Sequence, residues 1–444
     1  MRFLGVFLVV AAIALSPASG VGSTRPAAHA FDPSAASIDV ASALARQADG
    51  KLVLAGLSRR GGQYRFGLVR YRTNGTVDTS FGTHGIVLTA VGTNATATSS
   101  VVVQEDGKLV VGGGAYVSER QGAFALVRYN RRGALDASFG KGGRALTPLA
   151  PPPRPNKFDI ATIQGLALQA DGRIVAAGFS TNVTNTQRVA LARYGPTGKP
   201  DTAFGNGGSV VTTLGSRDGG SARAVAVQRD GKIVVAGSSM VRVGTLTESR
   251  FLVARFTRGG MLDARFGVAG KALAPALGYW DQPTAVALQA DGKIVVAGSV
   301  SVAQQGVQLG LARFLPNGRI DTGFGNGGTV LTNFAVLGGP ALAVAPDGNI
   351  VVACGLNGPR DFGVGRYEAD GTLDATFGEN GKVRTRLPAG ARATAVVLQR
   401  DGKIVAGGSS GGDFALARYA ADGTLDTGFG NAGIVTTPLG PAWR

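Results

Sequence analysis

Short runs of apolar residues alternate along the chain with turns that contain glycine. One group of four such runs covers residues 393–399, 403–407, 414–419 and 434–437. The first two runs are almost continuously apolar, a pattern typical of strands that are covered on both faces. The pattern therefore predicts four β-strands in this stretch, joined by tight turns.

The same pattern recurs seven times. Each unit has an Asp-Gly pair before its second run, an Arg followed by an aromatic residue at the end of its third run, and a second Asp three residues before a Phe-Gly pair. The Asp-Gly pairs begin at Asp49, Asp106, Asp171, Asp230, Asp291, Asp347 and Asp401. The repeated arginines are Arg70, Arg128, Arg193, Arg255, Arg313, Arg366 and Arg418, and the second aspartates are Asp78, Asp136, Asp201, Asp263, Asp321, Asp374 and Asp426. Seven complete units fill residues 35–440.

Two architectures stack such units so that both faces of each sheet are covered. A linear solenoid needs atypical polar units at its ends, and neither the first nor the seventh unit is atypical in this way. Radial repetition makes a β-propeller, for which seven units lie in the usual range. The sequence predicts an all-β fold, a seven-bladed β-propeller of four-stranded antiparallel blades. One way to close the ring is to pair the C-terminal strand at 434–437 with the N-terminal strand near 41–47.

The seventh unit reads LQRDGKIVAGGSSGGDFALARYAADGTLDTGFGNAG from Leu398 to Gly433 and resembles the bacterial delta-60 repeat. The resemblance extends over all seven units, because the three motifs recur in a fixed order. It implies a propeller fold and an exported location, and it implies no established catalytic residues. One departure lies at the start, where residues 31–34 look like a clipped copy of the second-Asp motif.

The first thirty residues have the composition of a secretory signal. Arg2 precedes an apolar run at residues 3–15, Pro17 follows it, and Ala28-His29-Ala30 fits the small-residue cleavage rule. The run is shorter than the roughly 20 residues that span a bilayer as a helix. We expect a signal peptide at 1–30 and a mature propeller domain at 31–444, secreted or associated with the cell envelope and without a transmembrane segment. An uncleaved membrane anchor is the alternative.

Composition limits the chemistry that the chain can perform. It has 70 Gly, which suits many tight turns, but only one Cys and two His. This excludes an intrachain disulfide framework and disfavours a transition-metal site, and we expect neither a metal nor a cofactor. Cys354 stands where sister units have Gly, inside a strand, which indicates a packed thiol and not a nucleophile.

The repeated motifs favour structural roles. The Asp-Gly pairs suggest two-residue hairpins in which Gly supplies a positive φ. The repeated Arg and the second Asp occur in equal numbers, which predicts an ion pair in each blade. Calcium binding by these aspartates would need several converging oxygens, and the sequence has no D-x-D-x-D loop.

Positive charge is in excess outside these motifs. The formal net charge is +17, whereas the motifs supply 14 Asp against 13 Lys or Arg. An exported protein with this surplus favours anionic partners, such as a cell-wall polymer, an acidic glycan, lipid head groups or a surface protein, over nucleic acid. Ordinary surface composition is the alternative explanation.

Loop variability indicates which face carries a site. The links between the second and third strands and those between successive blades vary among units, and in an up-and-down blade they emerge on one side. Trp280, in one of these links, could stack on a sugar or cover a blade junction, and cover is the commoner role. Five residues before the repeated Arg, at the entrance to the third strand, the units carry Arg65, Ala123, Arg188, Arg250, Gln308, Asp361 and Asp413. We expect a monomer that binds its ligand through Arg65, Arg188, Arg250 and Trp280.

Catalysis is the competing hypothesis. His84 is the only histidine of the mature chain and lies in a fixed turn, which disfavours a histidine-dependent mechanism, and no catalytic residue is assigned. A carboxylate-dependent hydrolase or lyase at the mouth of the propeller channel remains open, since four aspartates precede their Asp-Gly turns by ten or twelve residues. These are Asp39, Asp159, Asp218 and Asp281.

Overall fold

The computed structural model describes residues 38–150, 158–181, 186–215, 220–357 and 360–440. The predicted signal peptide and Asp218 lie outside the described residues. The described chain forms 28 strands. The first four blades contain β1 (Ile38–Arg46), β2 (Leu52–Arg60), β3 (Gln63–Tyr71) and β4 (Ile86–Thr89); β5 (Asn94–Val103), β6 (Leu109–Tyr116), β7 (Gly122–Tyr129) and β8 (Arg144–Thr147); β9 (Ala161–Leu168), β10 (Ile174–Thr181), β11 (Gln187–Tyr194) and β12 (Ser209–Thr212); and β13 (Ala222–Val227), β14 (Ile233–Val243), β15 (Leu246–Phe256) and β16 (Lys271–Leu273). The last three contain β17 (Trp280–Leu288), β18 (Ile294–Val302), β19 (Gly306–Phe314) and β20 (Thr329–Thr332); β21 (Val336–Val344), β22 (Ile350–Leu356), β23 (Phe362–Tyr367) and β24 (Lys382–Thr385); and β25 (Ala391–Leu398), β26 (Ile404–Ser410), β27 (Asp413–Tyr419) and β28 (Ile434–Thr437).

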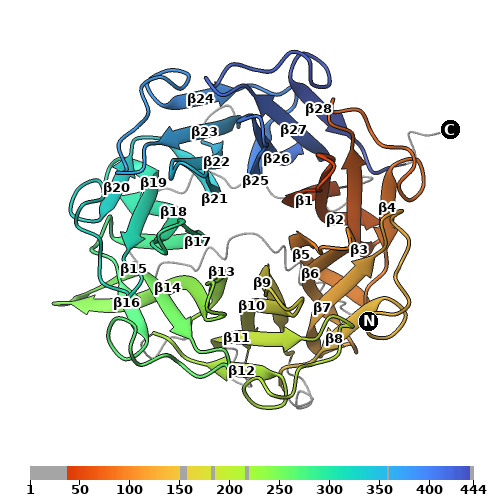
Figure 1. The fold of residues 1–444 in the computed structure, drawn as a ribbon, viewed down its shortest axis with the longest axis horizontal. Coiled ribbons are helices and arrows are strands. Elements are labelled where there is room, and N and C mark those ends of the chain that lie inside the picture. Colours follow the sequence, from red (N-terminus) through yellow and green to blue (C-terminus); the bar gives the residue numbers. More distant parts are fainter. Residues whose placement is uncertain (1–37, 151–157, 182–185, 216–219, 358–359, 441–444) are drawn as a thin grey trace, which may run out of the picture.

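The strands of each blade pair antiparallel in chain order, from β1-β2-β3-β4 through β25-β26-β27-β28. Blades 4 and 5 are joined into one sheet by a single parallel pair, Ser249 with Trp280. Figure 1 shows the first strand of every blade around the centre of the ring and the fourth strand at its rim. The protein is therefore a seven-bladed β-propeller, which confirms the predicted fold and rules out a solenoid.

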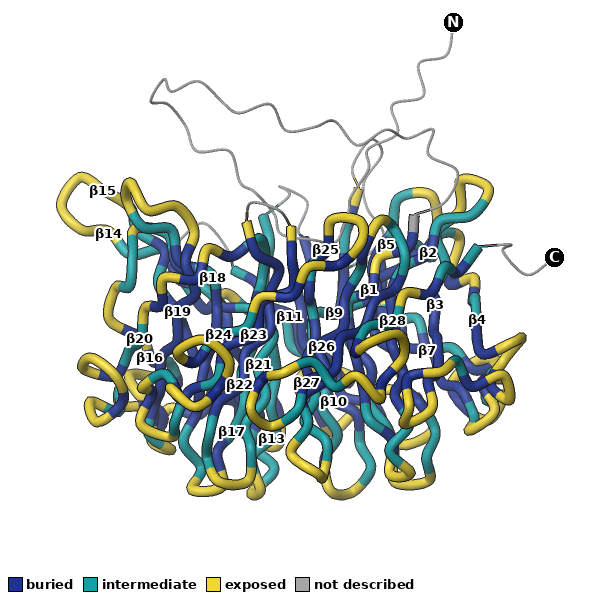
Figure 2. The backbone as a smooth tube through the Cα atoms, turned by 90° about the horizontal axis from the view of Figure 1, so that it is seen from above, coloured by how far each residue is buried: buried dark blue, intermediate teal, exposed yellow. Residues whose placement is uncertain are grey.

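The hydrophobic core lies between the blades. Seven clusters of buried residues each combine side chains of two neighbouring blades. In β2, Leu52, Val53, Leu54 and Ala55 are all fully buried, because one blade covers each face of the sheet. This explains why the second runs of the repeat are continuously apolar. Figure 2 shows the buried strands in the middle of the ring and the exposed turns at its two faces.

Ring closure differs from the pairing suggested by the sequence. The C-terminal strand β28 pairs only with β27, and β1 pairs only with β2. The predicted pairing is wrong because every blade takes its four strands consecutively, so that β1 lies at the centre and β28 at the rim.

Side chains close the ring between blades 7 and 1. The Tyr71 hydroxyl donates to Thr437 Oγ1 at 3.0 Å, and Thr394 Oγ1 donates to the Ala41 carbonyl at 2.9 Å. The Leu439 N–H donates to Asp39 Oδ2 at 3.0 Å. One of the core clusters also spans this junction. Closure therefore depends on packing and hydrogen bonds and not on a shared strand.

The repeated Arg and the second Asp form an ion pair in all seven blades, as predicted. The distance from Arg Nε to Asp Oδ2 is 2.6–2.9 Å. Each guanidinium lies over the Phe ring of the same blade at 4.4–4.8 Å from the ring centroid. Its Nη1 donates to a turn carbonyl of the next blade, including Arg418 to Thr73 across the closure. The motif thus links every pair of neighbouring blades.

The Asp-Gly turn is longer than the predicted two-residue hairpin. In blade 1, the Gln47 N–H donates to the Lys51 carbonyl and the Gly50 N–H donates to the Gln47 carbonyl. Gly50 has a φ of 84°, whereas no Asp of the described residues has a positive φ. Asp49 Oδ1 instead accepts a hydrogen bond from the Lys51 N–H at 3.2 Å. The prediction that Gly supplies the left-handed residue is confirmed, whereas the turn is longer than a two-residue hairpin and Asp stabilises it through its side chain.

Candidate functional site

We define the variable face as the side formed by the links between second and third strands and those between blades. It includes the β14–β15 hairpin, whose two strands have 11 residues each and which projects at the edge of this side (Figure 2). The tip of the hairpin exposes Val243 and Leu246. The fixed Asp-Gly turns lie on the opposite side.

The three predicted arginines lie at equivalent positions on the variable face. Each arginine lies in the third strand of its blade and pairs with a serine of the second strand: Arg65 with Ser58, Arg188 with Ser180 and Arg250 with Ser239. All three are half-buried, and the Nε of each makes no hydrogen bond. Figure 1 shows β3, β11 and β15 on different sides of the ring. The structure therefore places the arginines at one level of one face without gathering them into one pocket.

Carboxylates lie near two of these arginines. Arg250 Nη2 is 3.1 Å from Glu248 Oε2, and the positive charge of Arg188 lowers the pKa of Asp159 against the larger raising effect of burial. In the part of the chain that the structure describes, Arg65 has no ion pair. On the acidic side of the ring, Asp361 pairs with Arg384 at 2.6 Å, and burial raises the pKa of Asp413.

Trp280 lies where two blades meet. Its backbone pairs with Ser249 of blade 4 and with Ser301 of blade 5, and its side chain is half-buried. The neighbouring Tyr279 is 56% exposed. The position fits a residue that covers the junction, while Tyr279 offers the more accessible aromatic ring.

The candidate catalytic carboxylates do not converge. Asp39 Oδ2 is 2.9 Å from Arg60 Nη2, Asp159 accepts from Thr181 Oγ1 at 3.1 Å, and Asp281 accepts from the N–H groups of Leu277 and Gly278. They belong to blades 1, 3 and 5, and none of the three lines the central channel. The expectation that they approach the channel is wrong for these three, because their side chains turn into the blades and bond there.

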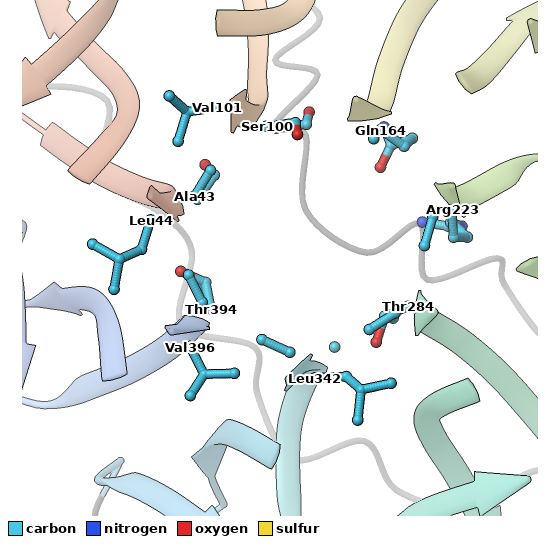
Figure 3. Close-up of a pocket in the computed structure, with 18 of the residues that line it drawn as sticks. Ala43, Leu44, Ser100, Val101, Gln164, Arg223, Thr284, Leu342, Thr394 and Val396 are labelled. Atoms are coloured by element: carbon cyan, nitrogen blue, oxygen red, sulfur yellow. The ribbon is translucent and has the colours of Figure 1, made fainter. Parts of the chain in front are cut away.

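The central channel contains a cavity with a volume of about 420 Å³. All seven first strands contribute to its wall, and Figure 3 shows Gln164, Arg223, Thr284 and Thr394 around the opening. Cavities of several hundred Å³ are typical of small-molecule sites.

A β-bulge in each first strand sets which residues face the channel. The register between first and second strands shifts at the same level in all seven blades. Bulges commonly re-aim a side chain beside a functional site. The residue seven positions before each Asp-Gly pair lies in this shift and lines the channel: Ser42, Ser99, Gln164, Arg223, Thr284, Pro340 and Thr394. These seven residues are called the bulge ring below.

Sequence reasoning missed the bulge ring, although a signal exists. Six of its seven members are polar residues inside strands that are otherwise mainly apolar. Two positions further along every strand, the channel wall is aliphatic in all seven blades. This second ring consists of Leu44, Val101, Leu166, Val225, Val286, Leu342 and Val396.

Two arginines are the only charged residues among the described residues that line the channel, Arg223 in the bulge ring and Arg392 two residues before Thr394. Burial lowers the pKa of both guanidiniums. The Arg392 side chain lies against the glycines of blade 6, because a Cβ atom built on Gly338 would come within 1.8 Å of Arg392 Nη2 and one on Gly355 within 2.6 Å of Arg392 Cγ. Arg392 Nε is buried and makes no hydrogen bond.

The sequence matches a family model described as "Domain of unknown function (DUF5122) beta-propeller" over residues 47–81, 104–139, 169–204, 228–266, 289–324, 345–377 and 399–429. These segments make up more than half of the chain. The chain belongs to this DUF5122 β-propeller family. No curated protein matches it.

Solved structures similar to this DUF5122 propeller include a protein of unknown function from Dyadobacter fermentans, with 14% identity, a TM-score of 0.43 and coverage of 71% of this chain and 89% of that chain. Drosophila Semaphorin 1b, extracellular domains 1-2, has 10% identity, a TM-score of 0.44 and coverage of 84% and 83%. Sqt1 from Chaetomium thermophilum has 12% identity, a TM-score of 0.41 and coverage of 89% and 85%. These likenesses carry no argument about function.

The matched segments of the DUF5122 propeller describe its scaffold. Each begins at or after the end of a first strand and ends in the Phe-Gly turn, so it contains the Asp-Gly turn and the Arg–Asp pair. All seven members of the bulge ring lie outside the matched segments. Family membership therefore accounts for the blades and leaves the channel residues to be explained from this chain.

The described residues lack the features of a metal site, a reactive thiol or a membrane-spanning helix. They contain no group of three or more His, Cys, Asp or Glu side chains that could hold a metal ion. Cys354 is fully buried, as predicted for a packed thiol, and burial raises its pKa to about 12. Across the described ranges, no helix has the length and apolar character needed to cross a membrane.

Proposed function

We propose that this DUF5122 propeller is an exported binding scaffold that holds an anionic polymer of the cell envelope, such as an acidic glycan, on its variable face. Arg65, Arg188 and Arg250 are the proposed contacts, and Trp280 with Tyr279 forms an aromatic edge near Arg250, at the junction of blades 4 and 5. The shared placement of the three half-buried arginines carries the proposal. Their separation around the ring suits an extended polymer better than a compact ion.

Three further observations support this proposal. The net charge of +17 favours anionic partners. The repeated arginines are used inside the blades, where they pair with the second aspartates, so the surplus charge belongs to other residues. Resemblance to delta-60 repeats and the signal-like residues 1–30 support export.

The test exchanges all three arginines for glutamate and measures binding to heparin and to long-chain polyphosphate. We expect the triple variant to lose at least tenfold in affinity at low salt, because the exchange reverses the local charge by six units. Binding by the parent should weaken steeply as salt rises, since exposed charges are screened over about 8 Å at physiological ionic strength. The matched control changes Arg132, Arg265 and Arg400, which are exposed in the fixed turns of the opposite side. Equal losses in both triple variants, or none in the first, would contradict the proposal.

The proposed export of the protein is tested separately, by determining its N-terminus. N-terminal sequencing of protein recovered from the medium or cell envelope should begin at Phe31. An intact Met1 terminus on membrane-bound protein would identify residues 1–30 as an anchor instead.

A further inference from the structure

Among the described residues, the wall of the central channel has two positively charged side chains and no acidic one. Arg223 enters from blade 4 and Arg392 from blade 7, and none of the described lining residues is Asp or Glu. Neither arginine has an ion pair within the described part of the chain. Partial burial weakens the hydration of both guanidiniums, so an anion that reaches them interacts more strongly than it would with a fully exposed arginine.

Blade 6 is shaped to receive side chains from its two neighbours. Its first strand has two glycines, Gly338 and Gly339, directly before the bulge residue Pro340. The equivalent positions carry larger residues in other blades, such as Val40 and Ala41 in blade 1 or Gln282 and Pro283 in blade 5. Arg392 of blade 7 lies over Gly338, and Thr284 of blade 5 lies over Gly339, where an added Cβ would come within 2.5 Å of Thr284 Cγ2. The glycines thus leave room for the side chains of Arg392 and Thr284 beside the channel wall.

The ring threonines face the channel as hydrogen-bond acceptors. Thr284 Oγ1 donates its proton to the Pro340 carbonyl at 2.7 Å, and Thr394 Oγ1 donates to the Ala41 carbonyl at 2.9 Å. A hydroxyl has one proton and two lone pairs, so each of these oxygens can only accept from a ligand. Acceptors suit a ligand that carries hydroxyl groups, whereas the arginines suit one that carries a carboxylate.

The second ring of channel residues, which is aliphatic in all seven blades, supplies apolar surface for the same ligand. It lies two residues beyond the bulge ring along every first strand, and it can cover the apolar C–H face of a small ligand. We propose that the channel binds a sugar acid, a compact molecule with one carboxylate and several hydroxyls. Arg392, which lies over blade 6, holds the carboxylate, Arg223 adds positive charge from blade 4, and Thr284 and Thr394 accept from the hydroxyls. This site is distinct from the polymer site on the variable face and does not depend on it.

Calorimetric titration of the mature protein with D-glucuronate tests the proposal, with D-glucose and acetate as the two partial ligands. Glucuronate should bind at least tenfold more tightly than either, because glucose lacks the carboxylate and acetate lacks the hydroxyls. The double variant Arg223→Gln with Arg392→Gln should weaken glucuronate binding at least tenfold. The matched control, Arg265→Gln with Arg400→Gln, should bind like the parent.

The two single variants keep the test informative if the double variant does not fold, and each should lose affinity. A hyaluronan hexasaccharide as a further probe distinguishes a free sugar acid from one within a glycan: tighter binding than glucuronate assigns the site to the glycan, and weaker binding to the free acid. Absence of glucuronate binding at 10 mM, equal affinity for acetate or glucose, or an unchanged affinity in the arginine variants would each overturn the proposal. The variable-face variant of Arg65, Arg188 and Arg250 should retain glucuronate binding, so failure of one proposal does not imply failure of the other.

Discussion

Asp281 is a single buried carboxyl whose titration should make the stability of this propeller depend on pH. Its side chain is fully buried at the junction of blades 4 and 5, where its oxygens accept from the N–H groups of Leu277 and Gly278. Burial raises the pKa of Asp281 to about 6, although the two N–H groups and the charge of Arg250 act in the opposite direction. An unfolded Asp titrates near 3.9, so the folded state binds the proton more tightly than the unfolded state does. The stability contribution of the neutral carboxyl is therefore complete below about pH 4 and is lost as the pH rises to about 6.

Asp281→Asn should remove this dependence, because the amide does not ionise. The melting temperature of the parent should fall relative to that of the variant between pH 4 and pH 7, as measured by thermal unfolding at several pH values. Glu105→Gln, at an exposed position, serves as the control and should run parallel to the parent. A difference between parent and Asp281→Asn that stays constant over this range would show that folding does not raise the pKa of Asp281.

At the scale of the element, seven versions of one turn allow comparison within the molecule. Ser80 Oγ donates to Asp78 Oδ1 at 2.7 Å, Ser138 does the same to Asp136 at 2.7 Å, and Thr376 to Asp374 at 2.6 Å. Gly323 occupies the equivalent position in blade 5, where its N–H alone reaches Asp321 Oδ1. The hydroxyl therefore helps to hold the carboxylate that pairs with the repeated Arg, and blade 5 lacks it.

Gly323→Ser should stabilise the protein by about 0.5–1.5 kcal/mol, because the unfolded chain loses freedom and the new hydroxyl gains an acceptor. A Cβ atom at Gly323 would come no closer than 3.5 Å to its neighbours, and its φ is not positive. Gly402→Ser is the contrasting control: Gly402 has a φ of 80°, so the same change should destabilise by about 1 kcal/mol. Denaturant unfolding measures both, and destabilisation by Gly323→Ser would disprove the equivalence of the turns.

The first strands mark the limit of what the sequence could predict. The repeats and their apolar runs were sufficient to predict seven four-stranded blades. The equal numbers of repeated Arg and second Asp residues were sufficient to predict the ion pair in each blade. The direction of side chains in a first strand was not predictable from alternation alone, because a bulge near Ser42 or Arg223 changes which residues face the channel. The polar residue at six of the seven bulges was the only signal in the sequence. For this reason the sequence placed Asp39 and Asp281 toward the channel and missed Arg392.

At the scale of the whole molecule, the first and last blades meet through the same contacts that join the others. The Tyr after the repeated Arg bonds to a Thr in the outer strand of the preceding blade, as Tyr129 does to Thr89 at 2.8 Å and Tyr419 to Thr385 at 2.8 Å. Tyr71 makes the corresponding bond to Thr437 across the closure. Because no strand is shared between the chain ends, this bond, the other hydrogen bonds across the junction and the core cluster keep the ring closed.

Tyr71→Phe should therefore cost as much as Tyr129→Phe, about 1–3 kcal/mol of unfolding free energy, since each leaves a buried threonine hydroxyl without its partner. Chemical denaturation of the two variants measures the costs. Adding Thr437→Val to Tyr71→Phe should recover part of the loss, because no buried hydroxyl then remains unpaired. If Tyr71→Phe is neutral while Tyr129→Phe is costly, the junction between blades 7 and 1 is open in solution. A neutral result at both positions would instead show that these bonds contribute nothing and that apolar packing alone holds neighbouring blades together.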